Sequence, residues 1–144
     1  MGDDWRAVIA EWKGELGFIG KNLSGGHVQM GMVNGEPGVS PMEMLLLGVA
    51  GCTGMDIASL LPKMRQKVTD LKISVRGKRA LDHPRIFTEI EILYELWGDD
   101  LDSKLVENAI QLSENKYCSA SAMLAKAAEI HTRTIIHPVL HSIA

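Results

Sequence analysis

Residues 40–65, SPMEMLLLGVAGCTGMDIASLLPKMR, decide the fold that the sequence predicts. They predict a long helix, because Ser40 can cap it, Pro41 suits the first helical position and Glu43 completes a capping box. Pro62 is expected to kink or end this helix, since it cannot donate to the preceding turn. Apolar residues occur on every face of the stretch. That pattern is typical of a buried helix.

Three glycines recur at every third position inside the predicted helix, at Gly48, Gly51 and Gly54. Each costs about 1 kcal/mol relative to alanine in a helix interior, so some other interaction must offset the cost. We interpret Gly48 and Gly54 as a small face that lets another element pack closely. Gly51 either belongs to that face or leaves room for a ligand beside Cys52.

Length and composition predict one domain over residues 1–144, because the 144-residue chain is 46% hydrophobic and too short for two full cores. The net charge of −3 and the scattered basic residues argue against a nucleic-acid or anionic membrane partner. The longest apolar run, residues 44–50, is far shorter than the roughly 18 residues of a membrane span, and the polar N-terminus does not resemble a signal peptide. We therefore expect a soluble, cytoplasmic protein.

The segments around the long helix alternate between strand and helix patterns. Residues 71–76 and 86–96 alternate polar and apolar side chains, and a turn at 80–85 between them predicts an antiparallel pair. The whole order predicts an α+β fold with antiparallel pairing. The expected elements are strands at 5–12 and 26–33, the long helix, strands at 71–76 and 86–96, helices at 101–112 and 119–128 separated by a break at 113–117, and a last strand at 130–136.

Two cysteines are the candidates for chemistry, Cys52 inside the long helix and Cys118 just before a short one. Two cysteines do not make a disulfide framework, so they are either core residues or redox residues. Helix position favours a thiolate at Cys118, whereas Asp56 should share a face with Cys52 and disfavour its thiolate. If the two thiols meet, one could reduce a peroxide and the other could resolve the sulfenic acid to a disulfide. Periodicity alone does not bring them together.

The histidines do not predict a metal centre. His131, His137 and His141 lie close in sequence, but no Cys-x-x-Cys or His-Glu-x-x-His spacing accompanies them. We expect surface or strand histidines and no metal.

The run SPMEMLLLGVAGC, followed later by ENKYCSASAMLAKAAEI, resembles the OsmC/Ohr family of thiol-dependent hydroperoxide peroxidases. The resemblance covers nearly the whole chain in element order. It implies an OsmC-like fold with antiparallel sheets around a long buried central helix, in an intertwined homodimer with its sites at the subunit interface. It also implies that Cys52 is peroxidatic and Cys118 resolving, with an external dithiol as reductant and no bound cofactor.

The chain departs from the family pattern at two supporting positions. The family has a glutamate directly after the helix proline, where this chain has Met42 and places Glu43 one residue later. The family also has an arginine in the N-terminal strand region, whereas here no arginine lies between Arg6 and the helix. Glu43 and Arg79 are therefore supporting candidates for the site. The arginines that could supply the missing charge are Arg65, Arg76 and Arg79.

Two other functions stay open at this level. One is a non-enzymatic module that binds a hydrophobic small molecule or lipid at the dimer interface, because methionines adapt to irregular apolar ligands. The residues that could line such a pocket are Met30, Met32, Met42, Met44, Met55, Met64, Trp5 and Trp12. The other is a structural or regulatory scaffold with inert cysteines.

Overall fold

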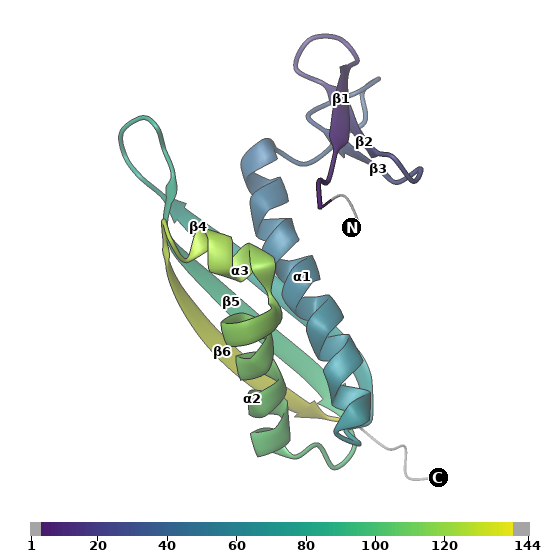
Figure 1. Cartoon of the computed structure of the whole chain (residues 1–144), viewed down its shortest axis with the longest axis vertical. Coiled ribbons are helices and arrows are strands. Elements are labelled where there is room, and N and C mark those ends of the chain that lie inside the picture. Colours follow the sequence, from purple (N-terminus) through teal and green to yellow (C-terminus); the bar gives the residue numbers. More distant parts are fainter. Residues whose placement is uncertain (1–3, 140–144) are drawn as a thin grey trace. The chain divides into compact units, whose positions relative to one another are not determined.

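The computed structural model describes residues 4–139 and divides into two compact units after Met44. The first unit contains β1 (Val8–Trp12), β2 (Phe18–Asn22), β3 (His27–Met30) and the first turn of α1 (Pro41–Lys63). The second contains the rest of α1 and six further elements (Figure 1). These are β4 (Val68–Arg79), β5 (Phe87–Gly98), α2 (Ser103–Leu112), the π-helix η1 (Ser113–Tyr117), α3 (Ser119–Leu124) and β6 (Glu129–Pro138). The single domain over 1–144 stays a prediction.

The first unit is an antiparallel meander in the order β1-β2-β3. The sequence analysis placed strands near β1 and β3 but missed β2, because that segment lies in a glycine-rich stretch. Gly17 is required just before β2, since a side-chain carbon there would lie 2.2 Å from the Met32 carbonyl oxygen. Several apolar side chains of this sheet are exposed, including Val8, Ile9 and Trp12.

The second unit contains a sheet in the order β4-β5-β6. β4 and β5 pair antiparallel as predicted, and Lys72 and Arg76 lie opposite Glu95 and Glu91 in the register. β6 pairs parallel with β5, so the prediction of antiparallel pairing throughout was wrong. The reason is the connection between them. α2, η1 and α3 form a helical crossover, which returns the chain to the same end of the sheet.

One face of this sheet forms the core. α1 and α2 cover the same face of the sheet (Figure 1). The α1 residues that face the core recur every four positions, as the helical period requires. In β5 every second residue faces the core, as the strand period requires. The buried α1 residues are Val49, Thr53, Ile57 and Leu61, and those of β5 include Ile90, Ile92, Tyr94 and Leu96.

α1 is buried on one face only within the chain, although its sequence predicts burial on every side. The opposite face is open: Met55 is 77% exposed, and side-chain carbons added at Gly48 or Gly51 would meet nothing within 4 Å. Gly54 differs, because a carbon there would lie 3.0 Å from Ile73 Cδ1 on β4. The close packing predicted for Gly54 is therefore confirmed, and among residues 4–139 the face at Gly48 has no packing partner.

α1 also has the length and composition of a membrane-spanning helix, with a hydropathy of 1.7 over its most apolar window. The core helices of proteins without membrane spans pass the same test, so this is weak evidence for a span. The predicted capping box begins the helix: Ser40 N donates to Glu43 Oε1 (2.8 Å) and Glu43 N donates to Ser40 Oγ (3.1 Å). The helix ends at Lys63, directly after Pro62, as predicted.

Candidate functional site

The second unit brings the two cysteines together. Cys52 is partly exposed on α1, and Cys118 is 2% exposed between η1 and α3. Both are free thiols. Cys52 lies close enough to Cys118 to contribute to a raised pKa of the Cys118 thiol. This contact could not be predicted from periodicity.

Cys118 itself begins α3. It has an extended backbone, and its Sγ accepts a hydrogen bond from Ser121 N at 3.3 Å. Its own N–H donates to the Ser113 carbonyl oxygen at 2.6 Å, which closes the π-helix in front of it. The sulfur of Cys118 therefore occupies the capping position of this helix.

The pKa of Cys118 is raised, mainly because burial disfavours the thiolate. The Ser121 hydroxyl and backbone N–H lower it, whereas the hydrogen bond to Cys52 raises it further. The interaction with Cys52 therefore favours the protonated form of Cys118. The Ser121 hydroxyl is close to the thiol, yet it has no partner with full hydrogen-bond geometry among the described residues. The expected thiolate preference of Cys118 is thus outweighed by burial.

A buried polar network lies next to the thiols. The Tyr94 hydroxyl donates to Glu114 Oε1 at 2.9 Å, and Thr132 Oγ1 donates to the same oxygen at 2.7 Å. Burial raises the pKa of Tyr94; the Thr53 hydroxyl lowers it, and the nearby charges of Glu114 and Cys118 raise it again. Tyr94 therefore stays a neutral phenol that donates to the Glu114 carboxylate.

A second hydrogen bond joins the two cysteine-bearing segments. Ser113 Oγ, at the start of η1, donates to Asp56 Oδ2 at 2.8 Å. Asp56 lies one turn after Cys52 on α1, so this bond fastens the helix of Cys52 to the turn that presents Cys118. The sequence analysis missed Tyr94, Glu114 and Ser113 as site residues. The available signal was a tyrosine in the middle of the apolar face of a strand.

The two supporting candidates are engaged elsewhere. Glu43 is held in the capping box, where the Ser40 backbone N–H lowers the pKa of its carboxyl. Arg79 Nε donates to the Arg85 carbonyl oxygen at 2.9 Å, in the loop between β4 and β5. Arg76 pairs with Glu91 across β4 and β5. Their roles toward Cys52 stay predictions.

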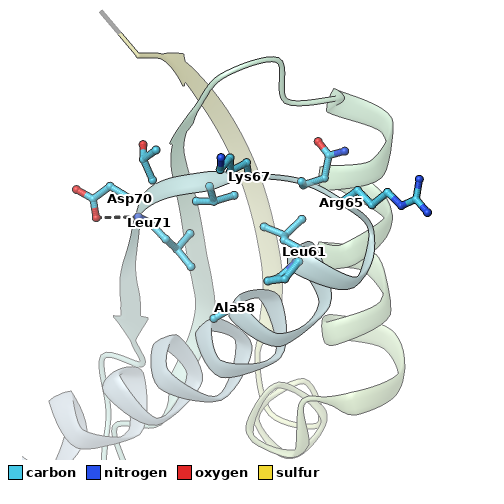
Figure 2. Close-up of a pocket in the computed structure, with 10 residues that line it drawn as sticks. Ala58, Leu61, Arg65, Lys67, Asp70 and Leu71 are labelled. Atoms are coloured by element: carbon cyan, nitrogen blue, oxygen red, sulfur yellow. Dashed lines mark hydrogen bonds between the residues drawn. The ribbon is translucent and has the colours of Figure 1, made fainter.

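A separate pocket of about 580 Å³ lies where α1 passes into β4 (Figure 2). Leu61 and Leu71 contribute apolar side chains, and Arg65 and Lys67 contribute basic ones. Figure 2 shows the Arg65 side chain directed away from Asp70, whose carboxylate accepts from Leu71 N at 2.8 Å. Neither cysteine lines this pocket, so it is distinct from the thiol site.

One histidine meets two carboxylates on the outer face of the sheet. Oxygen and nitrogen ligand atoms of Glu89, Glu129 and His131 all lie within 4.8 Å of one another. Lys78 Nζ also lies 3.7 Å from Glu89 Oε2 and competes for that carboxylate. His137 pairs with Glu95 (3.0 Å), and His141 lies outside the described residues. The absence of a metal stays a prediction.

Known proteins resemble this chain over most of its length. A family model described as OsmC-like protein matches residues 33–133. Protein YhfA of Escherichia coli strain K12 is 38% identical over 120 residues, which are 83% of this chain and 90% of that protein. A hypothetical protein from Aquifex aeolicus VF5 has a crystal structure with a TM-score of 0.84 and 34% identity, covering 96% of this chain and 100% of that one. The organic hydroperoxide resistance protein OhrB of Bacillus subtilis shares the fold with a TM-score of 0.60 and 16% identity, covering 91% and 98%.

Proposed function

Because the chain belongs to the OsmC-like family, we propose that it reduces organic hydroperoxides or hydrogen peroxide through Cys52 and Cys118. The observation that carries the proposal is the proximity of two free thiols from separate elements of one unit, close enough that Cys52 contributes to the raised pKa of Cys118. The name of OhrB, an organic hydroperoxide resistance protein with the same fold, supports this substrate class.

Burial and charge assign different roles to the two thiols. Cys52 is partly exposed, so a peroxide can reach its sulfur, whereas Cys118 is almost fully buried. The raised pKa of Cys118 keeps its thiol protonated beside Cys52. Cys52 is therefore the attacking thiol and Cys118 the resolving one.

The proposed reaction consumes one hydroperoxide and two thiols. The Cys52 thiolate attacks the outer peroxide oxygen, the O–O bond breaks, and Cys52 becomes a sulfenic acid while an alkoxide leaves. The Cys118 S–H supplies a proton to the alkoxide, giving the alcohol. The resulting Cys118 thiolate attacks the Cys52 sulfur and displaces hydroxide, which takes a proton from solvent to give water. An external dithiol, rather than a bound cofactor, then reduces the disulfide.

We further propose that the active form is an intertwined homodimer in the cytoplasm. The exposed face of α1 and the exposed apolar side chains of the first unit support a second copy as the covering partner. Such faces are uncommon on proteins that stay monomeric. A second copy could also supply the positive charge that the family places near the first cysteine, for which Arg79 stays the candidate.

The proposal is tested by consumption of an organic hydroperoxide in the presence of excess dithiol. Wild-type protein should turn over, and Cys52→Ser should fall to the uncatalysed rate because it lacks the attacking sulfur. Cys118→Ser should still form a sulfenic acid at Cys52 but no disulfide, as intact-mass measurement would show. Lack of turnover by wild-type protein whose thiols are reduced at the start would reject the peroxidase function.

The first unit gives a second candidate function some support. It contains a mostly apolar pocket of about 470 Å³, to which Met30 and Met44 contribute. This pocket would suit a hydrophobic small molecule or lipid. Native mass spectrometry of freshly purified protein tests it: a retained ligand that is unaffected by Cys52→Ser would favour binding over catalysis.

A further inference from the structure

Ser121 has a buried hydroxyl that the structure leaves unpaired. The residue is 3% exposed, and its Oγ has no hydrogen-bond partner with full geometry among residues 4–139. Buried hydroxyls are normally paired, because an unpaired one loses its hydrogen bonds to water and gains none in return. An unpaired donor inside the thiol site therefore points to a role in another state of that site.

The backbone of Ser121 places this hydroxyl beside the Cys118 sulfur. Ser121 N donates to Cys118 Sγ at 3.3 Å, which fixes the two residues against each other at the start of α3. Side chains of a helix lean toward its N-terminus, so the Ser121 side chain extends back toward Cys118. Burial raises the pKa of Cys118, and the Ser121 hydroxyl and backbone N–H oppose that effect.

The bond that would usually occupy such a side chain is already taken. In a capping box, the third residue of the helix bonds back to the N–H of the capping residue. Here the Cys118 N–H donates to the Ser113 carbonyl oxygen at 2.6 Å, and the Cys118 carbonyl oxygen accepts from Ala122 N at 3.1 Å. Because both backbone groups of Cys118 are engaged, its sulfur is the group left for the Ser121 hydroxyl.

We propose that the Ser121 hydroxyl is held unpaired to become the second hydrogen-bond donor, beside Ser121 N, to the thiolate of Cys118. A protonated thiol is a weak acceptor, whereas a buried thiolate needs donors that replace water. Donors that are fixed in place before a charge develops stabilise that charge without reorganisation. One residue thereby supplies two donors to one sulfur.

The inference rests on the proposed peroxidase function only for the steps at which this thiolate forms. One step is resolution, when Cys118 has given its proton to the alkoxide and attacks the Cys52 sulfenic acid. The other is recycling: a sulfur of the external dithiol attacks Cys52, the more exposed sulfur, and the S–S bond breaks with its electron pair on Cys118. The second sulfur of the dithiol then releases Cys52. Ser121 stabilises Cys118 as the nucleophile in the first step and as the leaving group in the second.

The test measures thiol–disulfide exchange of Cys118 without any peroxide. In a Cys52→Ala background, the protein reacts at about pH 8 with an excess of bis(2-hydroxyethyl) disulfide, and intact mass reports the mixed disulfide. Ser121→Ala removes the hydroxyl but keeps the backbone N–H. We expect the Cys118 thiolate to become about tenfold scarcer and, because a less stabilised thiolate is more nucleophilic, the exchange to slow about threefold.

The matched control is Ser119→Ala, which removes a hydroxyl from an exposed position of the same helix and should leave the exchange rate unchanged. An unchanged or faster rate in Ser121→Ala would overturn the proposal, because losing a hydroxyl that only held the turn in place would expose Cys118 more often. Ser121→Thr keeps a hydroxyl at this position and should restore the rate. A rate in Ser121→Thr as slow as that in Ser121→Ala would also overturn the proposal.

The measurement separates this inference from the proposed function, since it uses neither peroxide nor Cys52. Slower exchange in Ser121→Ala, in a protein that shows no peroxide turnover, would leave the role of Ser121 standing and reject only the peroxidase reaction. Peroxide turnover by wild-type protein with an unchanged exchange rate in Ser121→Ala would reject the role of Ser121 and leave the peroxidase reaction.

Discussion

Tyr94 is a phenol enclosed in an apolar strand face, and its neighbours explain why the hydroxyl is retained there. A buried hydroxyl without a partner is costly, but Glu114 accepts its proton. The bond also gives the Glu114 carboxylate a hydrogen-bond donor, which offsets part of the cost of burying its charge.

Removing that hydroxyl should lower stability. Tyr94→Phe preserves the packed ring but leaves Glu114 with one donor fewer, so we expect the free energy of unfolding to fall by about 1–3 kcal/mol. Urea denaturation measures the change. Tyr117→Phe is the control, because Tyr117 is half exposed. Removing the Tyr117 hydroxyl should lower the free energy of unfolding by less than about 0.5 kcal/mol. Equal effects of the two substitutions would contradict the role of the Tyr94–Glu114 bond.

Tyr94 should also shape stability at alkaline pH. Its pKa is raised in the folded state above the ordinary value near 10, so above that pH the folded chain keeps a proton that the unfolded chain loses. The contribution of Tyr94 to stability is therefore full below about pH 10 and falls as pH rises, by at most about 1.4 kcal/mol per pH unit. Cys118 has the same sign and begins near pH 8.5.

The contribution of Tyr94 can be isolated by comparing slopes. Urea denaturation of Tyr94→Phe should give a flatter decline of the free energy of unfolding above pH 10, while the decline between about pH 8.5 and 10 should persist because Cys118 is still present. A slope above pH 10 equal to that of wild type would show that Tyr94 ionises normally.

At the scale of elements, the π-helix η1 connects α2 to the thiol site. It closes through Cys118 N donating to the Ser113 carbonyl, and it is anchored to α1 through Ser113 Oγ and Asp56. Ser113 is fully buried. The turn therefore positions Cys118 by two bonds from one residue, one made by its backbone and one by its side chain.

Removing the side-chain bond should loosen Cys118 while leaving the backbone bond in place. Ser113→Ala leaves the Asp56 carboxylate without this donor, so we expect a loss of about 1–3 kcal/mol in the free energy of unfolding. Alkylation of Cys118 in native protein should become faster, as mass spectrometry with a thiol reagent would detect. Ser119→Ala, at an exposed position of α3, is the control and should change neither quantity. Unchanged alkylation in Ser113→Ala would show that the anchor does not restrain the turn.

At the scale of the whole molecule, each unit carries apolar surface that the described part of the chain leaves exposed. On α1 the open face combines Gly48, Gly51 and Met55, and in the first unit the strands expose Val8 and Trp12. A three-stranded sheet needs a covered apolar face for independent stability. A second copy that covers both surfaces would account for them.

The oligomeric state tests this account directly. Light scattering coupled to size-exclusion chromatography should give twice the chain mass of 15.8 kDa. Met55→Glu should shift the protein toward a single chain mass, because a buried charge opposes association. Asn108→Glu adds the same charge to an exposed position of α2 and should leave the mass unchanged. A wild-type protein of single chain mass would reject the dimer.

Local patterns were sufficient for much of the fold. The Ser40–Glu43 capping box, the end of α1 at Pro62 and the pairing of β4 with β5 follow from residues close together in the chain. β2 was not predicted, because it lies in a glycine-rich stretch that shows no clear strand pattern. The parallel pairing of β6 with β5 could not be predicted, because strand direction depends on how the helical crossover packs. The alternation of side chains within β6 is the same for either direction.

The sequence by itself determined which residues could carry chemistry, Cys52 and Cys118, and the helices on which they lie. Only the tertiary structure decided that the two thiols meet, that burial keeps Cys118 protonated, and that Tyr94 donates to Glu114. The physical reason is range. A helix cap or a strand face is encoded within a few residues, whereas the bond from Asp56 to Ser113 joins positions 57 residues apart and exists only once the crossover has packed on α1.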